Sequence, residues 1–295
     1  MNSDSLINHK ILESKPLFGL YIIATPIGNM EDLSIRAANL LINLDYIYAE
    51  DSSKTIKILS YLNHNRSIKI YNEQSSNNKR KEIIDLIKNG HSVGLVSDAG
   101  TPLISDPGYK LVRDIYDNNL NIYPIPGPSS ITTALSCSPL PTDNFTFLGF
   151  PPRKNESLRN YLNELKAQKT CFIFFEAANR VLFLLEALAD IFKGKEICVV
   201  RELTKLHEEK IFSRTEDIYS QLQNKNLKGE FVILLYNDID KKNVTFTNDL
   251  IKVIEIGSKY LSVKDLSKFL SEISNITKKE IYNLAIEKFD ERNKK

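Results

Sequence analysis

The chain has 295 residues, of which 42% are hydrophobic and 26% charged, and its formal net charge is +2. This length and composition predict a soluble globular protein with one large or two mid-sized domains. The small net charge excludes a global field that attracts nucleic acid, so an RNA partner would have to be held by local patches. Residues 241–295 form one such region, with 12 Lys and Arg against 8 Asp and Glu.

The three cysteines, Cys137, Cys171 and Cys198, are widely spaced and form no C-x-x-C pair. This spacing argues against a zinc site or a disulfide framework and is typical of the reducing cytosol. No apolar run approaches the roughly 18 residues of a membrane span. Residues 1–16 are polar and mixed in charge, so we expect a disordered tail and not a targeting signal. The sequence therefore predicts a cytoplasmic protein without a metal and without a membrane contact.

The first half of the chain alternates between strands and helices. Apolar and β-branched runs predict strands at 17–25, 46–49, 67–71, 93–97 and 122–125. Helical patterns follow each of them, at 32–43, from residue 53, through Ile83 and Ile87 to Gly90, at 109–118 and at 129–136. This repetition predicts a mostly parallel sheet covered by helices. Each strand ends in Gly, Pro, Asp or Ser, and parallel strands place these turns at one edge, which is the predicted site.

The most informative turn lies between Gly94 and Gly108, with the sequence G-L-V-S-D-A-G-T-P-L-I-S-D-P-G. A buried strand breaks there into small residues, and Gly100 would let backbone groups approach a ligand that a Cβ atom would keep away. An ordinary tight connection between strand and helix is the alternative. The chain lacks G-x-G-x-x-G and a P-loop lysine, so neither a dinucleotide nor a nucleoside triphosphate is expected.

Paired prolines next to basic residues, at 145–154, indicate a domain boundary. We therefore divide the chain into a first α/β domain at 17–148 and a second at 149–240. The second half has predicted helices at 157–167 and 179–192 and predicted strands at 170–176, 196–201 and 231–236. Because strand follows strand more closely there, the second domain is predicted to be α+β with antiparallel pairs.

The last section, 241–295, is predicted to be a linker followed by a small helical domain that contacts RNA. The sequences S-V-K-D at 262–265 and T-K-K-E at 277–280 are typical capping boxes, and each opens a short amphipathic helix. Two capped helices near the basic end resemble a helix-turn-helix. A solvated charged face is the alternative reading of the lysines.

Five motifs occur in the order and spacing of a known family. They are L-Y-I-I-A-T-P-I-G-N, A-E-D-S-S-K-T, V-S-D-A-G-T-P-L-I-S-D-P-G, P-G-P-S-S and R-E-L-T-K-L-H-E-E. Through them the chain resembles, over about residues 17–292, the bacterial 16S rRNA (cytidine-2′-O)-methyltransferases of the tetrapyrrole methylase superfamily. The resemblance implies two α/β domains with S-adenosylmethionine in the cleft between them, a small C-terminal helical domain and a homodimer.

The activity that the resemblance implies is methyl transfer to the ribose 2′-oxygen of a cytidine in the decoding region of 16S rRNA, within the small ribosomal subunit. Two departures from the family pattern stand out. Ala178 and Asn179 precede Arg180 where the family has Pro-His-Arg, and Ser52-Ser53-Lys54 stands where it has Thr-Arg-His. Both departures remove a histidine, so no role of those histidines carries over.

The predicted cofactor contacts come from strand-end turns and, in the second domain, from position in the superfamily pattern. They are Pro26, Ala99, Gly100, Thr101, Ile104, Ser129 and Ser130 in the first domain and Phe175, Val199 and Arg201 in the second. A cofactor of this kind needs backbone donors and acceptors and an apolar slot, and no metal. Ordinary core packing is the alternative for Ile104, Phe175 and Val199.

Transfer to a hydroxyl requires alignment and removal of the hydroxyl proton. The candidate proton acceptors at strand ends are Glu50, Asp51, Asp98, Asp106, Glu202 and Lys205. We favour Glu202 and Lys205 as the catalytic pair, because residues three apart meet if the segment is helical. A surface ion pair is the alternative. The candidate phosphate contacts, which would position RNA without reading its sequence, are Arg36, Lys54, Arg153, Lys154 and Arg180.

Two other functions are compatible with these patterns. One is a methylase of the same superfamily that acts on a small tetrapyrrole, although the helical tail and a basic rim disfavour it. The other is a non-catalytic RNA-binding assembly factor, against which the intact turns at Pro26, Gly100 and Gly127 count.

Overall fold

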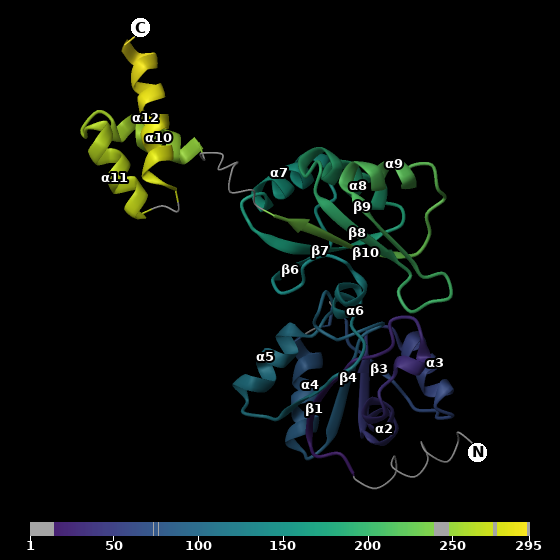
Figure 1. Cartoon of the computed structure of the whole chain (residues 1–295). Coiled ribbons are helices and arrows are strands. Elements are labelled where there is room, and N and C mark those ends of the chain that lie inside the picture. The colour runs from purple at the N-terminus through teal and green to yellow at the C-terminus, as the bar shows by residue number, and fades with distance from the viewer. Residues whose placement is uncertain (1–14, 73, 76, 239–247, 274–275, 294–295) are drawn as a thin grey trace. The chain divides into compact units, whose positions relative to one another are not determined.

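The computed structural model describes residues 15–72, 74–75, 77–238, 248–273 and 276–293. The chain divides into two compact units, Met1–Asn237 and Asp238–Lys295. Most of the predicted tail and of the predicted linker lie outside the described residues. The first unit contains two five-stranded sheets, and the second contains helices (Figure 1).

The first sheet has the strand order β3-β2-β4-β1-β5, and every pairing in it is parallel. This confirms the prediction from the alternating pattern. The strands are β1 (Gly19–Ile23), β2 (Tyr46–Ala49), β3 (Lys69–Ile70), β4 (Ser92–Val96) and β5 (Ile122–Ile125). The helices between and after them are η1 (Met30–Asp32), α2 (Ile35–Asn43), α3 (Ser52–Tyr61), α4 (Asn77–Lys88), α5 (Tyr109–Asp117) and α6 (Ser130–Cys137).

Both faces of the first sheet are covered, because successive side chains of a strand point to opposite faces. In β1, Tyr21 and Ile23 pack with α2 and α3, while Leu20 packs with α4 and α5. Figure 1 shows these two helix pairs on opposite sides of the sheet. Strands buried on both faces explain why the first half of the sequence shows continuous apolar runs.

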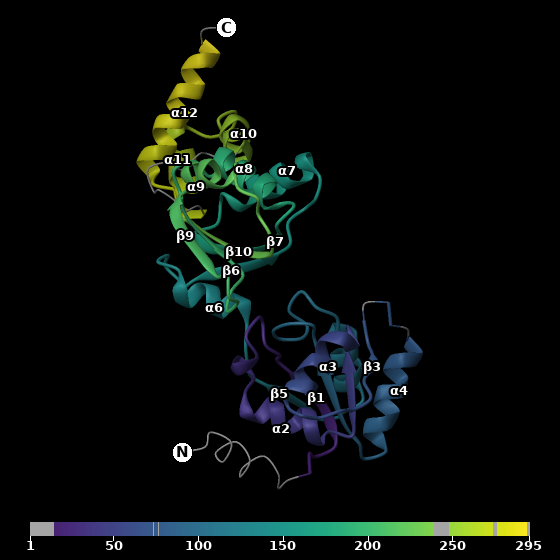
Figure 2. The ribbon, with the colours of Figure 1, turned by 90° about the vertical axis from the view of Figure 1, so that its right-hand side faces the viewer.

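The second sheet has the order β6-β7-β10-β8-β9, with one parallel pairing, between β6 and β7, and three antiparallel ones. Its strands are β6 (Phe145–Gly149), β7 (Thr170–Ala177), β8 (Glu196–Arg201), β9 (Glu209–Arg214) and β10 (Glu230–Asn237). Helices α7 (Asn155–Leu165), α8 (Val181–Ile191) and α9 (Thr215–Leu222) cover one face through the largest core cluster. The other face packs on α6, which lies across the sheet from those helices (Figure 2).

Two strands of the second sheet and one helix that covers it were not predicted from the sequence. β6 crosses the expected boundary at 148/149 and is hydrogen-bonded to β7, so the second sheet begins before that boundary. β9 is an edge strand whose residues alternate between half-buried and exposed. It contains charged residues and lacks the continuous apolar run that marks the other strands in the sequence. α9 buries Ile218 and Leu222 but opens on polar residues.

The second unit contains α10 (Asn248–Gly257), α11 (Val263–Ile273) and α12 (Lys278–Asn293). Ile254, Leu266, Leu270, Ile281 and Ala285 form its buried core. The predicted cap at Thr277 is confirmed, because Glu280 N donates to Thr277 Oγ1 at 3.3 Å and Thr277 N donates to Glu280 Oε2 at 2.9 Å. At the other predicted cap, Asp265 N donates to Ser262 Oγ at 3.2 Å. None of the described helices combines the length and apolarity needed to cross a membrane.

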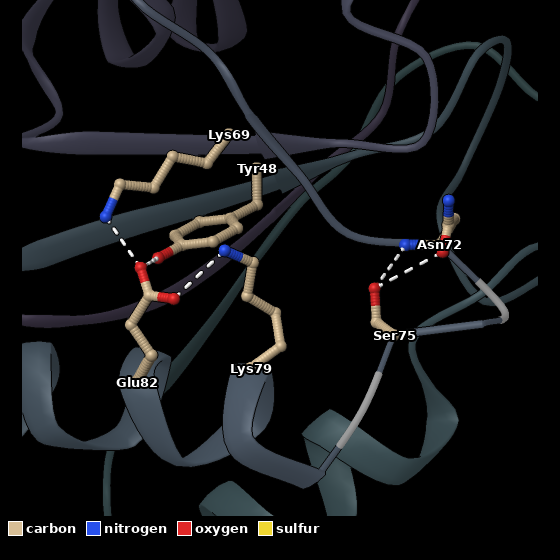
Figure 3. Close-up of polar contacts among 6 residues, drawn as sticks. All are labelled: Tyr48, Lys69, Asn72, Ser75, Lys79 and Glu82. Carbon is tan, nitrogen blue, oxygen red and sulfur yellow. Dashed lines mark hydrogen bonds and ion pairs between the residues drawn. The ribbon is translucent and has the colours of Figure 1, made fainter.

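A polar cluster fastens the edge of the first sheet to α4. Glu82 accepts hydrogen bonds from Lys69 Nζ at 2.6 Å, from Lys79 Nζ at 3.0 Å and from the hydroxyl of Tyr48 at 2.8 Å (Figure 3). The hydrogen bond from Lys69 has the largest effect and, with those from Lys79 and Tyr48, outweighs burial and lowers the pKa of Glu82 to about 2. The nearby Asn72 and Ser75 form a separate turn in the same view.

This cluster predicts a pH-dependent contribution to stability. A depressed carboxylate pKa stabilises the folded state above the unfolded pKa of about 4.3, and this stabilisation is lost as the pH falls toward 2. Glu82→Gln should therefore lower the free energy of unfolding at pH 7 by about 1 kcal/mol, a figure discounted for solvent screening because the side chain is 38% exposed. Denaturant titrations of the variant and the wild type should converge as the pH falls to about 2 and below. The exposed Glu164→Gln is the control, and an equal loss at all pH values would contradict this account.

Candidate functional site

Hydrogen bonds tie together three strand-end turns of the first sheet. Thr25 N, after β1, donates to Gly100 O at 2.9 Å, and Gly100 N, after β4, donates to Thr25 O at 3.0 Å. Thr101 Oγ1 donates to Pro128 O, after β5, at 3.3 Å. Because β1 lies between β4 and β5, the carboxyl ends of the three strands are neighbours. This is the sheet edge at which open α/β folds bind ligands.

Gly100 adopts a backbone conformation that favours glycine. Its φ is +80°, and a Cβ atom there would lie 3.4 Å from Cγ2 of Ile27. The absence of a side chain lets the peptide groups on either side of Gly100 line a cavity. The predicted role of Gly100 in exposing backbone to a ligand is therefore compatible with its geometry.

A cavity of about 340 Å³ opens between these turns and the second sheet. This volume lies in the range of sites for small ligands and cofactors. The walls combine peptide groups of 98–101, hydroxyls of Ser129 and Ser130, and apolar side chains from β7, β8 and β10. Seven of the ten predicted cofactor contacts line it: Ala99, Gly100, Thr101, Ile104, Ser129, Ser130 and Phe175.

Three predicted cofactor contacts are not among the lining residues. Pro26 is buried next to Ile27, which does line the cavity. Val199 is 1% exposed and packs in the core on the opposite face of the second sheet, because strand residues alternate between faces. The adjacent Val200 takes the lining position. Arg201 donates from Nε to Lys228 O at 2.6 Å and contacts Glu209 at 3.4 Å.

The described lining residues carry more negative than positive charge. Four carboxylates, those of Asp98, Asp106, Glu176 and Glu230, share the cavity with the ammonium of Lys205. A wall of this sign favours a ligand with a positive charge. The apolar remainder provides a surface on which a planar ring can pack.

Asp106 differs from an ordinary surface carboxylate. Burial, reinforced by the neighbouring charge of Asp98, raises its pKa to about 6, against the opposing effect of a hydrogen bond with Ser97. A carboxyl group with this pKa accepts a proton effectively near neutral pH. A perturbed carboxyl group in a cavity is also a typical feature of a functional site.

Glu176 and Arg180 form an inward-facing ion pair. Glu176 is 2% exposed, and its Oε2 lies 3.2 Å from Nη2 of Arg180. The same guanidinium donates to the carbonyl oxygens of Pro151 at 3.3 Å and Pro152 at 3.2 Å. Arg180 is thus held against the segment between β6 and α7, and its predicted phosphate contact stays a prediction.

The predicted catalytic pair meets, but in a turn and not in a helix. Lys205 N donates to Glu202 O at 3.0 Å, and both Glu202 and Thr204 have positive φ, at +51° and +63°. Lys205 Nζ donates to Glu202 Oε1 and to Glu230 Oε2, each at 2.9 Å. Lys205 lines the cavity. Glu202 does not line it, but accepts the hydrogen bond that positions the Lys205 ammonium. Strained backbone of this kind clusters at functional sites.

The charge states of this pair follow from its hydrogen bonds. Burial alone lowers the pKa of Lys205, but the bonds to Glu202 and Glu230 outweigh it and raise the pKa above its usual value. Burial raises the pKa of Glu202, and the bonds from Lys205 and Glu230 N outweigh it and lower the pKa. Lys205 is therefore an ammonium at neutral pH, without a lone pair to accept a proton. Glu202 is a carboxylate, but its lowered pKa makes it a weaker base than a carboxylate with a raised pKa.

Several lining residues escaped the sequence-based prediction of cofactor contacts. Glu176 ends the buried run C-F-I-F-F-E, and a carboxylate at such a strand end was a usable signal. Phe150 follows β6 and Glu230 begins β10, and both become neighbours of the site only through tertiary folding. The predicted phosphate contacts Arg36, Lys54, Arg153 and Lys154 are exposed. No group of three or more His, Cys, Asp or Glu residues within the described part of the chain could hold a metal ion.

Comparison with known proteins agrees with this geometry. The model of the Tetrapyrrole (Corrin/Porphyrin) Methylases matches residues 19–219. A Ribosomal RNA small subunit methyltransferase I from Rickettsia prowazekii is 44% identical over 276 residues, which cover 92% of this chain and 97% of that protein. A protein of the same name from Vibrio cholerae is 34% identical over 92% of this chain and 96% of its own length.

Solved structures show the same fold at much lower sequence identity. A diphthine synthase superposes with a TM-score of 0.59 at 13% identity, covering 75% of this chain and 91% of that one. A cobalt precorrin-4 methyltransferase gives a TM-score of 0.55 at 15% identity, with 74% and 94% covered. The family model's match to residues 19–219, together with relatives that are 34–44% identical over 92% of the chain, shows that the chain belongs to the tetrapyrrole methylase family.

Proposed function

We propose that this protein transfers a methyl group from S-adenosylmethionine to the ribose 2′-hydroxyl of a cytidine in the decoding region of 16S rRNA, within the small ribosomal subunit. The observation that carries the proposal is the match, over 92% of the chain, to relatives named as small-subunit rRNA methyltransferases. The family that the ordered motifs resemble methylates the 2′-oxygen of a cytidine, and this resemblance supports the proposed position and nucleotide. We further propose that it acts in the cytoplasm as a homodimer.

S-adenosylmethionine is the methyl donor of this family, and the residues at the cavity fit it. Its sulfonium and ammonium groups are positively charged. Of the four carboxylates in the described wall, Glu176 and Glu230 form ion pairs with Arg180 and Lys205, so Asp98 and Asp106 are the ones that would face the cofactor's charge. The peptide groups around Gly100 and the hydroxyls of Ser129 and Ser130 would hold its polar ends, with Phe175 and Val200 against its adenine. When bound, it supplies a methyl group already activated on sulfur.

We assign the removal of the hydroxyl proton to Asp106. With cofactor and ribose bound, the Asp106 carboxylate would accept the hydroxyl proton as the ribose oxygen is methylated. Its place in the cavity wall and its pKa of about 6 suit that role near neutral pH. Lys205 takes a different part from the one expected, because as an ammonium it would orient the ribose or an adjacent phosphate.

The direct test of the reaction is tritium transfer from labelled S-adenosylmethionine. Purified small subunits that lack the modification should accept label, while naked rRNA and a precorrin should accept little or none. Label that appeared on the precorrin alone would identify a small-molecule methylase. No transfer, together with no cofactor binding in calorimetry, would leave a non-catalytic RNA-binding factor.

Gly100→Val should weaken cofactor binding by roughly 10-fold or more, because the new side chain enters the cavity and a positive φ disfavours it. Calorimetry with S-adenosylmethionine measures the effect, and circular dichroism checks the fold. Gly194→Val is a matched control, because Gly194 also has a positive φ, of +78°, but open space around its Cβ position. Normal binding by Gly100→Val would show that this turn is only scaffold.

Asp106→Asn should slow methyl transfer by about 100-fold or more. In the wild type, kcat/KM should rise from pH 5 to pH 7 with an apparent pKa of about 6, because the carboxylate must be ionised to accept the proton. The rise should be absent in the variant, while calorimetry still detects cofactor binding. An unchanged pH profile in Asp106→Asn would assign the proton to another group.

A further inference from the structure

Phe150 is an exposed aromatic residue in the wall of the cavity. Its side chain is 59% exposed although it lines the site. Its ring packs edge-on against Phe175, with 5.8 Å between centroids and 66° between planes, and Phe175 packs in turn against Phe147 at 4.8 Å. One side of the Phe150 ring is thus supported, and much of the rest is open to solvent.

The backbone before Phe150 is shaped to present it. The pairing of β6 with β7 shifts register between Phe147 and Gly149, which marks a bulge. Gly149 has φ of +64°, and a Cβ atom there would lie 3.3 Å from Oγ of Ser105 in the cavity wall. Bulges next to active sites commonly re-aim a side chain. Here the bulge ends β6 one residue before Phe150.

The backbone after Phe150 is fastened from the second sheet. Arg180, paired with the buried Glu176, donates to the carbonyl oxygens of Pro151 and Pro152. The segment that carries Phe150 is therefore held in place before any ligand arrives. The next two residues, Arg153 and Lys154, are exposed cations.

We propose that Phe150 is the platform on which the base of the target nucleotide stacks, with Arg153 and Lys154 contacting the flanking phosphates. This inference rests on the proposed function and adds the mode of substrate recognition to it. Proteins recognise single-stranded RNA by stacking unpaired bases on exposed aromatic rings. A base held on Phe150 would place its own ribose beside the cavity that contains Asp106, which is the alignment that the transfer requires.

The adenine of S-adenosylmethionine is the competing occupant of this ring. The two occupants make different predictions, because loss of a base platform weakens RNA binding and loss of an adenine slot weakens cofactor binding. Variants of the full-length protein separate them. Phe150→Ala removes the aromatic ring, Phe150→Leu keeps an apolar side chain without a flat aromatic surface, and Phe150→Tyr keeps the aromatic ring. Phe145→Ala is the control, since Phe145 begins β6, the strand that ends just before Phe150, and is 44% exposed and not among the residues that line the cavity.

Three measurements are made on each variant. Calorimetry gives the dissociation constant for S-adenosylmethionine. Co-sedimentation with unmodified small subunits, in the presence of S-adenosylhomocysteine, gives the affinity for RNA without turnover. Tritium transfer gives KM and kcat. Phe150→Ala and Phe150→Leu should weaken subunit binding and raise KM by roughly 10- to 100-fold. Phe150→Tyr and Phe145→Ala should behave as the wild type, and all variants should bind the cofactor normally.

Four results would overturn the inference. Cofactor binding that weakens together with subunit binding in Phe150→Ala would assign the ring to adenine. If Phe150→Leu behaves as the wild type, the contact is a generic apolar one and needs no aromatic ring. If Phe150→Ala behaves as the wild type, or if the wild-type protein does not bind subunits, Phe150 is not a base platform. If the wild type binds subunits but transfers no label, the proposed reaction fails, and the co-sedimentation series still decides the role of Phe150.

Discussion

The paired hydrogen bonds between Thr25 and Gly100 hold the turns after β1 and β4 side by side at the cavity. The parallel order of β4, β1 and β5 makes these turns neighbours, and the hydroxyl of Thr101 extends the connection to Pro128. A wall built from peptide groups needs such fastening, because a loop free to move would have to be ordered by the ligand at a cost in affinity. The same edge also contributes two carboxyl groups to the cavity, those of Asp98 and Asp106.

The chemistry is concentrated in a few carboxyl groups whose surroundings separate their roles. Asp106 lies beside Asp98 and is partly buried, so its pKa is raised toward neutrality. Glu202 lies behind Lys205, outside the cavity wall, and hydrogen bonds from Lys205 and the amide of Glu230 lower its pKa. Glu176 forms an ion pair with Arg180, and Arg180 in turn holds the segment that carries Phe150. Environment, more than residue type, distinguishes proton acceptor, anchor and support.

The first sheet was predictable because its strands are buried on both faces and its helices are amphipathic, so that apolar runs mark them in sequence. The turns at 98–101 and 129–130 could be predicted to share one edge, because parallel strands end there, and their residues line the candidate cavity. A continuous apolar run does not reveal which residues face which side of the sheet. Val199 was predicted to face the cofactor, but it packs in the core, and its neighbour Val200 lines the cavity. The orientation of Arg180 and the exposure of Phe150 arise from contacts between distant segments, which local patterns do not contain.

The most direct test of the account is to identify the nucleoside that the protein produces. Unmodified small subunits are incubated with the protein and S-adenosylmethionine, and the 16S rRNA is then digested and analysed by mass spectrometry. The account predicts one new 2′-O-methylcytidine within the decoding region. A methyl group on a base, a different nucleotide, or label confined to a small molecule would contradict it.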